Sequence, residues 1–263
     1  MIVESLTHLF TPAPKWVKKL GFVAEAIAIE ERLKRCQQNW LPHLNRSKKI
    51  ILAEAAKLPS GSHILVIGAG GLHDVPYRCL AVSGYKMSLL DIVFLKAARA
   101  KVKRLSGIAL IEHDITNYAK PFFNWLDNPN TALPEPTAPP HINELVQSKP
   151  DLIISLNILS QLPIQFEEKV RAVAHGQSFA KQEQALIEQH IYWLKSQNCP
   201  VLIITDIEWQ TLLNEKTESI EPLPHLKALG EPVDTWHWDI APKGEAHKSK
   251  ALRHKVGAWL LNN

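Results

Sequence analysis

Three glycines that directly follow a short apolar run are the clearest chemical signal in the sequence. The run Ile-Leu-Val-Ile at 64–67 leads into Gly68-Ala69-Gly70-Gly71-Leu72-His73. Glycines after a strand let the backbone approach a ligand closely, and the N-terminus of a following helix favours negative charge. A dinucleotide-binding turn, G-x-G-x-x-G/A, needs a small third residue, but His73 stands there. No Gly-Lys-Ser/Thr follows, so the motif is not a P-loop.

Two carboxylates occupy matching positions farther along the chain. Asp91 ends the apolar run 86–92, 23 positions after Gly68 (91 − 68), and Asp114 ends the run 107–114. An acid at the end of a second strand can accept hydrogen bonds from ribose hydroxyls. An acid at the end of a third strand can accept a hydrogen bond from the amino group of adenine. The three positions together predict a nucleoside site.

Five continuous apolar runs alternate with helical stretches and must position these residues. They span residues 63–68, 86–92, 107–114, 151–157 and 200–206. Continuous apolar runs are typical of parallel strands that helices cover on both faces. The alternation predicts a doubly wound α/β fold, whose ligands bind outside the carboxyl ends of the strands.

Both ends of the chain depart from that alternation. Residues 1–58 read as a helical segment with a break at Pro42, and residues 59–263 as the main domain. The five prolines in 127–141 predict an extended surface loop. Residues 234–242 and 254–262 read as two strands without a helix between them, which favours an antiparallel pair. The expected sheet therefore has seven strands, mostly parallel, with an antiparallel pair at its C-terminal end.

This ordered set of motifs resembles the class I S-adenosylmethionine-dependent methyltransferases, which have a Rossmann-like fold. The resemblance covers roughly residues 60–261 and rests on "VIGAGG", "LLDI", "EHDIT" and "DLIISLNILSQLP". It implies S-adenosylmethionine as the cofactor, methyl transfer as the activity and N-terminal helices over the mouth of the site. The cofactor-binding residues that it implies are Gly68, Ala69, Gly70, Gly71, Asp91, Ile92, Asp114, Ile115 and Asn157.

The chain departs from the pattern of this family at two positions. The acid that often begins the glycine motif, and helps to hold the methionine part of the ligand, aligns with Val66. The third glycine of the family aligns with Leu72, and the polar residues His73 and Asp74 follow it. These departures leave open whether catalysis is retained.

The sequence offers several candidates for contact with the reacting centre. His237 and Asp239 share one face of the strand predicted at 234–242, and we expect them to be the catalytic pair, because a histidine can act as a base near neutral pH. Asn157, Asp206 and Glu208 follow the fourth and fifth strands. Aromatic residues that could line a substrate wall or a lid are Trp236, Trp238, Tyr192, Trp193, Trp16, Phe22 and Trp40.

Composition narrows the class of partner. Residues 1–57 hold ten Lys/Arg against five Asp/Glu, a net charge of +5, so RNA is a possible partner of these basic helices. A small-molecule acceptor is favoured, since neither an N-P-P-Y-like motif nor an aromatic RNA-binding motif occurs. The cysteines have no metal-ligand spacing, and no signal peptide or membrane-spanning run is recognisable, so we expect a cytoplasmic protein without a metal.

Two alternative functions compete with methyl transfer. An NAD(P)-dependent oxidoreductase would need a Y-x-x-x-K pair or its equivalent, which the chain lacks. A non-catalytic binding protein that has kept the fold, and that docks RNA or a protein partner, remains an alternative because of Val66. The sequence does not indicate the oligomeric state.

Overall fold

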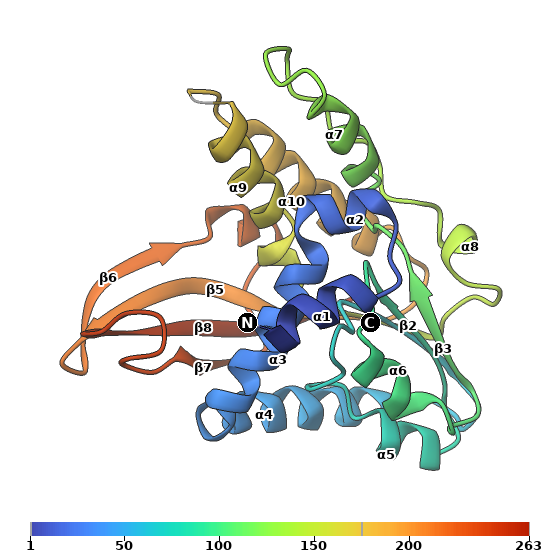
Figure 1. The fold of residues 1–263 in the computed structure, drawn as a ribbon. Helices are drawn as coiled ribbons and strands as arrows, with labels where there is room; N and C mark the ends of the chain where they lie inside the picture. Colours follow the sequence, from blue (N-terminus) through green and yellow to red (C-terminus); the bar gives the residue numbers. More distant parts are fainter. Residues whose placement is uncertain (1, 175, 263) are drawn as a thin grey trace.

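A computed structural model of the chain describes residues 2–174 and 176–262. Helices cover both faces of one central sheet (Figure 1). The strands are β1 (His63–Ile67), β2 (Lys86–Asp91), β3 (Ile108–Glu112), β4 (Leu152–Leu156), β5 (Val201–Leu213), β6 (Lys216–Pro222), β7 (Asp234–Ala241) and β8 (Lys250–Leu261). The helices after β1 are α5 (Tyr77–Val82), α6 (Lys96–Val102), α7 (Ala119–Trp125), α8 (Ile142–Leu145), α9 (Ile164–Val173) and α10 (Ala180–Lys195).

The order of the strands confirms the predicted fold class. The sheet runs β3-β2-β1-β4-β5-β8-β7, with parallel pairing from β3 to β5 and antiparallel pairing of β8 with both of its neighbours. The predicted antiparallel pair at the end of the chain is therefore present. The sheet has eight strands, because the exposed strand β6 pairs with the far half of β5. The sequence analysis did not anticipate β6, whose polar residues carry no strand-like apolar run.

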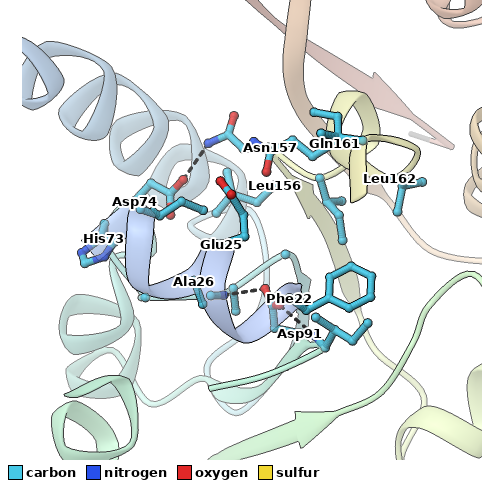
Figure 2. Close-up of a pocket in the computed structure, with 18 of the residues that line it drawn as sticks. Phe22, Glu25, Ala26, His73, Asp74, Asp91, Leu156, Asn157, Gln161 and Leu162 are labelled. Atoms are coloured by element: carbon cyan, nitrogen blue, oxygen red, sulfur yellow. Dashed lines mark hydrogen bonds between the residues drawn. The ribbon is translucent and has the colours of Figure 1, made fainter. Parts of the chain in front are cut away.

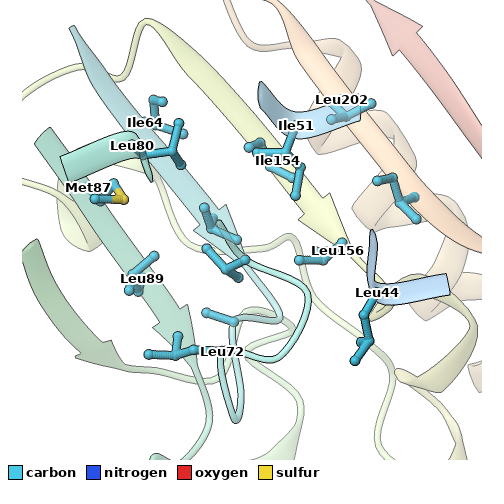
Figure 3. Packing of buried hydrophobic residues seen from close by; sticks show 14 of the residues in the cluster. Leu44, Ile51, Ile64, Leu72, Leu80, Met87, Leu89, Ile154, Leu156 and Leu202 are labelled. Atoms are coloured by element: carbon cyan, nitrogen blue, oxygen red, sulfur yellow. The ribbon is translucent and has the colours of Figure 1, made fainter. Parts of the chain in front are cut away.

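Side chains of β1 alternate between the two helical layers. Ile64 and Val66 face the layer that holds Ile51 of helix α4 (Gln37–Ala55) and Leu80 of α5 (Figure 3). Leu65 and Ile67 face the opposite layer, which includes the α10 residues Ile187, Ile191 and Leu194. All five residues of β1 are buried, so close packing on both faces fixes the end of the strand from which the next turn begins.

The N-terminal segment forms the helices α1 (Ile2–Phe10), α2 (Lys15–Leu20), α3 (Phe22–Arg35) and α4. The predicted break at Pro42 is wrong: α4 continues through this proline, and the chain bends at Cys36 instead. Proline removes one helical hydrogen bond. The buried face of α4, with Trp40, Leu44 and Ile51, holds the helix together across that gap.

The proline-rich loop at 127–141 begins with turns and has no helix or strand from residue 132 onward. Side chains from α10 and from the turn before α7 donate hydrogen bonds to its carbonyls at 134, 136, 138 and 140. Alternate carbonyls point the same way in an extended chain, and prolines leave no N–H groups to satisfy. The loop is thus pinned along α10, away from the cavity described below.

The part of the chain that the structure describes has neither a metal-binding cluster nor a membrane-spanning helix. No group of three or more His, Cys, Asp or Glu residues is arranged to hold a metal ion. No helix combines the length and the apolar character needed to cross a bilayer.

Candidate functional site

A cavity of about 420 Å³ opens at the carboxyl ends of β1, β2, β4 and β5. This size is within the usual range of small-molecule sites. Helix α3 forms its opposite wall through residues at helical spacing, among them Phe22, Glu25, Ala26 and Ile29 (Figure 2). All nine predicted cofactor-binding residues line this one cavity.

Gly68 and Gly70 form the floor of the cavity for different reasons. Gly68 has a φ of 82°, and a Cβ there would lie 2.4 Å from the carbonyl oxygen of Leu156. Only glycine can therefore pass this close to β4. At Gly70 the φ is 39°, and a Cβ would meet only the carboxylate of Asp91, at 3.5 Å. The space over Gly70 is open to a ligand.

Leu72 and His73 lie where the glycine motif differs from the motif of the methyltransferases that the sequence resembles. Leu72 adopts a φ of 60°, the left-handed conformation that glycine prefers, and its side chain is buried in the core. Nε2 of His73 lies 2.9 Å from Oε1 of Glu30 on α3. The ammonium of Lys101 donates to the carbonyl of Gly71 at 2.6 Å. The loop is thus tied to α3 and to α6.

Asp91 projects from the end of β2 toward the glycine loop. Its Oδ2 accepts a hydrogen bond from the Gly70 N–H at 2.8 Å, and its Oδ1 accepts one from the Ile92 N–H, also at 2.8 Å. Burial raises the pKa of Asp91 to about 6, although these backbone hydrogen bonds oppose the increase. The N–H of Val93 also stabilises the ionised form, so of about four acceptor positions Asp91 keeps capacity for a ligand hydroxyl.

Asp114 is more fully occupied by its own neighbours. Its Oδ1 accepts from the N–H and the hydroxyl of Thr116, at 2.9 and 2.6 Å, and its Oδ2 accepts from the N–H of Ala119 at 2.8 Å. Three of its roughly four acceptor positions therefore shape the turn into α7. One position is left for an amino group of a ligand.

Asn157 connects three elements at the end of β4. Its Nδ2 donates to Oδ2 of Asp74 at 2.7 Å (Figure 2). The same Nδ2 lies 3.2 Å from Nε2 of His43 on α4. Burial raises the pKa of Asp74 and lowers the pKa of His43 to about 3, so this histidine is neutral. Asp74 therefore brings a carboxyl group into the cavity although Val66, the position of the missing acid, lies in the core.

The cavity has a second end, where β5 extends beyond β4. The parallel pairing of β4 and β5 stops at Leu156 and Ile204, and β5 then continues between β6 and β8. Asp206 lies just past that point, 2% exposed, and it accepts hydrogen bonds from the hydroxyl of Ser160 and the indole N–H of Trp209. Nδ1 of His254 on β8 lies 3.0 Å from Oδ2 of the same carboxylate.

His237 and Asp239 do not line this cavity. His237 is exposed and is paired with Lys255 in the sheet, and Asp239 forms an ion pair with Arg253 at 2.6 Å. Trp238, between them in the chain, does line the cavity. Because successive side chains of a strand point to opposite faces, the face that carries Trp238 cannot also carry His237. The structure does not bring our expected catalytic pair to the cavity.

Only some of the other candidates line the cavity. Asp206, Trp238, Phe22 and Trp40 line the cavity, whereas Glu208 does not. The aromatic residues outside it are Trp16, Tyr192, Trp193 and Trp236. Trp193 is buried against the proline-rich loop and Tyr192 is exposed, both on α10, so neither belongs to a substrate wall. The sequence analysis missed His43, Trp209 and His254, which come from three separate elements.

Comparisons with known proteins show similarity to solved methyltransferases. No model of a protein family matches the sequence, and no curated protein matches it significantly. A methyltransferase of Geobacter sulfurreducens solved with S-adenosylhomocysteine is 13% identical, with a TM-score of 0.40 over 82% of this chain and 90% of that one. The N-methyltransferase NodS of Bradyrhizobium japonicum, also solved with S-adenosylhomocysteine, is 12% identical, with a TM-score of 0.37 over 81% and 85%.

A third solved structure is the 1,6-didemethyltoxoflavin-N1-methyltransferase of Burkholderia thailandensis. It is 12% identical, with a TM-score of 0.39 over 81% of this chain and 77% of that one.

Proposed function

We propose that the protein transfers a methyl group from S-adenosylmethionine to a small-molecule acceptor. The observation that carries this proposal is the convergence of the open glycine loop at Gly70, the carboxylate of Asp91 and the turn at Asp114 in one cavity. These three positions lie at successive strand ends and match the needs of a nucleoside: close backbone approach, acceptors for ribose hydroxyls and an acceptor for the adenine amino group.

The residues around the loop also fit the amino-acid part of this cofactor. Asp74 supplies a carboxyl group within the same cavity, and Asn157 holds it at 2.7 Å. We assign to Asp74 the role of the missing acid at Val66, which is to accept hydrogen bonds from the ammonium group of the methionine part. A neighbouring ammonium would favour the ionised form of Asp74 and offset the burial that raises its pKa.

The chain's own residues have two tasks in such a reaction. The bound cofactor supplies an activated methyl group on a sulfonium. The protein must hold the acceptor in line with that methyl group and exclude water. Phe22 and Ile29 of α3 cover the cavity from the side opposite the glycine loop, so this helix contributes the apolar cover. Trp40, Trp209 and Trp238 line the other end of the cavity, where an acceptor would lie.

Calorimetry with S-adenosylmethionine, S-adenosylhomocysteine and NAD tests the proposal directly. We expect micromolar dissociation constants for the first two and no binding of NAD, with affinity for the first two lost in Asp91→Ala. Tight binding of NAD alone would favour an oxidoreductase. Binding of none of the three, together with salt-sensitive RNA binding, would favour a non-catalytic protein that uses its basic helices.

A further inference from the structure

Three aromatic side chains form a row across three strands at the end of the cavity beyond β4. His254 on β8 is paired directly with Trp209 on β5 and, on its other side, with Trp238 on β7. The ring of His254 stacks on Trp209 with centroids 5.6 Å apart and meets Trp238 edge-on at 5.8 Å. All three rings line the cavity. The rings are not coplanar, since the plane of Trp238 stands at 74° to that of His254, and the row combines aromatic surface with one nitrogen base.

Asp206 lies behind this row and contacts only one nitrogen of His254. Its side chain is 3% exposed, whereas that of His254 is 15% exposed. Oδ2 of Asp206 receives the hydrogen bonds of Ser160 and Trp209, both at 3.1 Å, and lies 3.0 Å from Nδ1 of His254. Burial favours the neutral acid, but the charge of His254 when it is protonated, together with the hydrogen bonds from Trp209 and Ser160, lowers the pKa of Asp206 below its ordinary value. The carboxylate is therefore ionised.

An ionised Asp206 determines which nitrogen of His254 carries the proton. A buried carboxylate next to Nδ1 favours a hydrogen on that atom, as a carboxylate does beside other catalytic histidines. The neutral imidazole then carries its lone pair on Nε2, and no hydrogen bond from Nε2 occurs among the described residues. Oδ1 of Asp206 and Nδ1 of His254 each lack an aligned hydrogen bond among these residues, so the two groups are close but are not saturated by the fold.

We propose that His254, oriented by Asp206, is the proton acceptor of this site, and that the acceptor substrate is a planar aromatic molecule with a ring N–H or a phenolic O–H. This inference rests on the proposed methyl transfer. The acceptor's lone pair forms the new bond to the methyl carbon, the sulfur–carbon bond breaks with its electron pair going to sulfur, and the acceptor's proton passes to Nε2 of His254. The imidazolium that forms is stabilised by Asp206.

The planar class of acceptor follows from the composition of the row. Trp209 and Leu252, which lies two residues before His254 on the same face of β8, line the cavity with apolar surface. Trp238 also lines it, although one face of its ring stacks on His43 at 4.0 Å. Aromatic rings stack with offset or edge-on geometry and gain energy beyond their buried area. A flat ring next to this row can place its N–H or O–H at Nε2, whereas a bulky aliphatic molecule cannot stack there.

The first test reads the protonation of His254 by nuclear magnetic resonance, without an acceptor. In protein labelled with ¹⁵N-histidine and saturated with S-adenosylhomocysteine, the signals that disappear in His254→Gln identify this residue. We expect the proton on Nδ1 and an unprotonated Nε2, and a loss of this preference in Asp206→Asn. His237→Gln, an exposed residue on the opposite face, is the control and should leave the His254 signals unchanged. A proton on Nε2, or no change in Asp206→Asn, would overturn the assignment.

Because Asp206 is buried, Asp206→Asn could fail to fold, and Trp209→Phe then serves as the second variant. It removes one donor to Oδ2 and keeps an aromatic ring, so it should weaken the tautomer preference without abolishing stacking. An unchanged tautomer preference in folded Trp209→Phe would contradict the role of the Trp209 donor in orienting His254 through Asp206.

The second test addresses the acceptor with benzimidazole and 2-naphthol as probes. We expect both to bind the protein loaded with S-adenosylhomocysteine and to shift the ring signals of His254, and cyclohexanol not to bind. With S-adenosylmethionine, methyl transfer to a probe should fall about 10²- to 10⁴-fold in His254→Gln. Binding of S-adenosylhomocysteine without binding of either planar probe would overturn the acceptor class. Failure of S-adenosylhomocysteine itself to bind would instead overturn the proposed function.

Discussion

The carboxylate of Asp91 accepts a hydrogen bond of 2.8 Å from the backbone N–H of Gly70, which joins the end of β2 to the loop after β1. The residue proposed to bind ribose therefore also holds the loop on which the cofactor would rest. Asp114 has a more structural role, since three hydrogen bonds to its carboxylate stabilise the turn into α7. The two acids should consequently respond differently to the same substitution.

Asp91→Asn should lower the affinity for S-adenosylhomocysteine by about 10- to 100-fold, because charge-assisted hydrogen bonds to ribose are lost. Asp114→Asn should cost less affinity but more stability, since it weakens the hydrogen bonds to Thr116 and Ala119. Calorimetry and urea unfolding of the two variants separate these effects. A larger loss of affinity in Asp114→Asn than in Asp91→Asn would contradict this division of roles between the two acids.

Asp74→Asn should discriminate between ligands that carry the amino-acid part and ligands that lack it. We expect the affinity for S-adenosylhomocysteine to fall about tenfold in this variant. The affinity for 5′-methylthioadenosine should change by less than about twofold, since this ligand has no ammonium group for Asp74 to contact. Asp91→Asn is the matched variant and should weaken both ligands. Equal losses for both ligands in Asp74→Asn would show that Asp74 acts only through the fold.

Leu72→Gly should be at least as stable as Leu72→Ala. A left-handed φ of 60° costs a non-glycine residue about 1 kcal/mol, and glycine removes that cost. Both variants lose buried apolar area, which costs about 2–5 kcal/mol for Leu→Ala. At the control position Leu80, buried in helix α5, glycine should instead be about 1 kcal/mol less stable than alanine. The reverse order at Leu72, measured by urea unfolding, would argue against strain in the glycine loop.

The free energy of unfolding should fall on acidification below pH 6.5, in part through His43. Burial lowers the pKa of His43 to about 3, from 6.5 for the unfolded chain. Between these values the unfolded state binds a proton that the folded state lacks, so this group removes about 1.4 kcal/mol of stability per pH unit. Burial has the same effect on His190, whose pKa is about 4. His43→Gln should therefore show a shallower pH dependence than the unsubstituted protein.

The shifted pKa of Asp91 changes the pH dependence of stability in the opposite direction to that of His43, which provides a second test. Its pKa is raised to about 6, so its contribution to stability is present below the unfolded value of 3.8 and is lost as the pH rises through 6. In Asp91→Asn this compensation is absent, and stability should fall more steeply between pH 6 and pH 4. Urea unfolding at half-unit pH steps measures both slopes. Equal slopes in all three proteins would contradict these two pKa shifts.

The order of the elements and the cofactor end of the site could be predicted from the sequence alone. Continuous apolar runs identify parallel strands that are covered on both faces, and the carboxyl ends of parallel strands meet at one edge of a sheet. Gly68, Gly70, Asp91 and Asp114 each directly follow or end such a run. Their meeting in one cavity therefore needed no knowledge of distant contacts.

The residues at the end of the cavity proposed for the acceptor could be identified only from the tertiary structure. Alternation along residues 234–242 places Trp238 and His237 on opposite faces of the strand. Which face meets the cavity is determined only by the pairing of β7 with β8 and by the packing of α4 against β7. The pairing of β8 with β5 places His254 beside Trp209 and Asp206, which lie almost 50 residues earlier in the chain. Likewise, Pro42 stays within a helix because the packing of α4 outweighs one missing hydrogen bond. Register and packing depend on contacts between remote segments, and local patterns do not encode them.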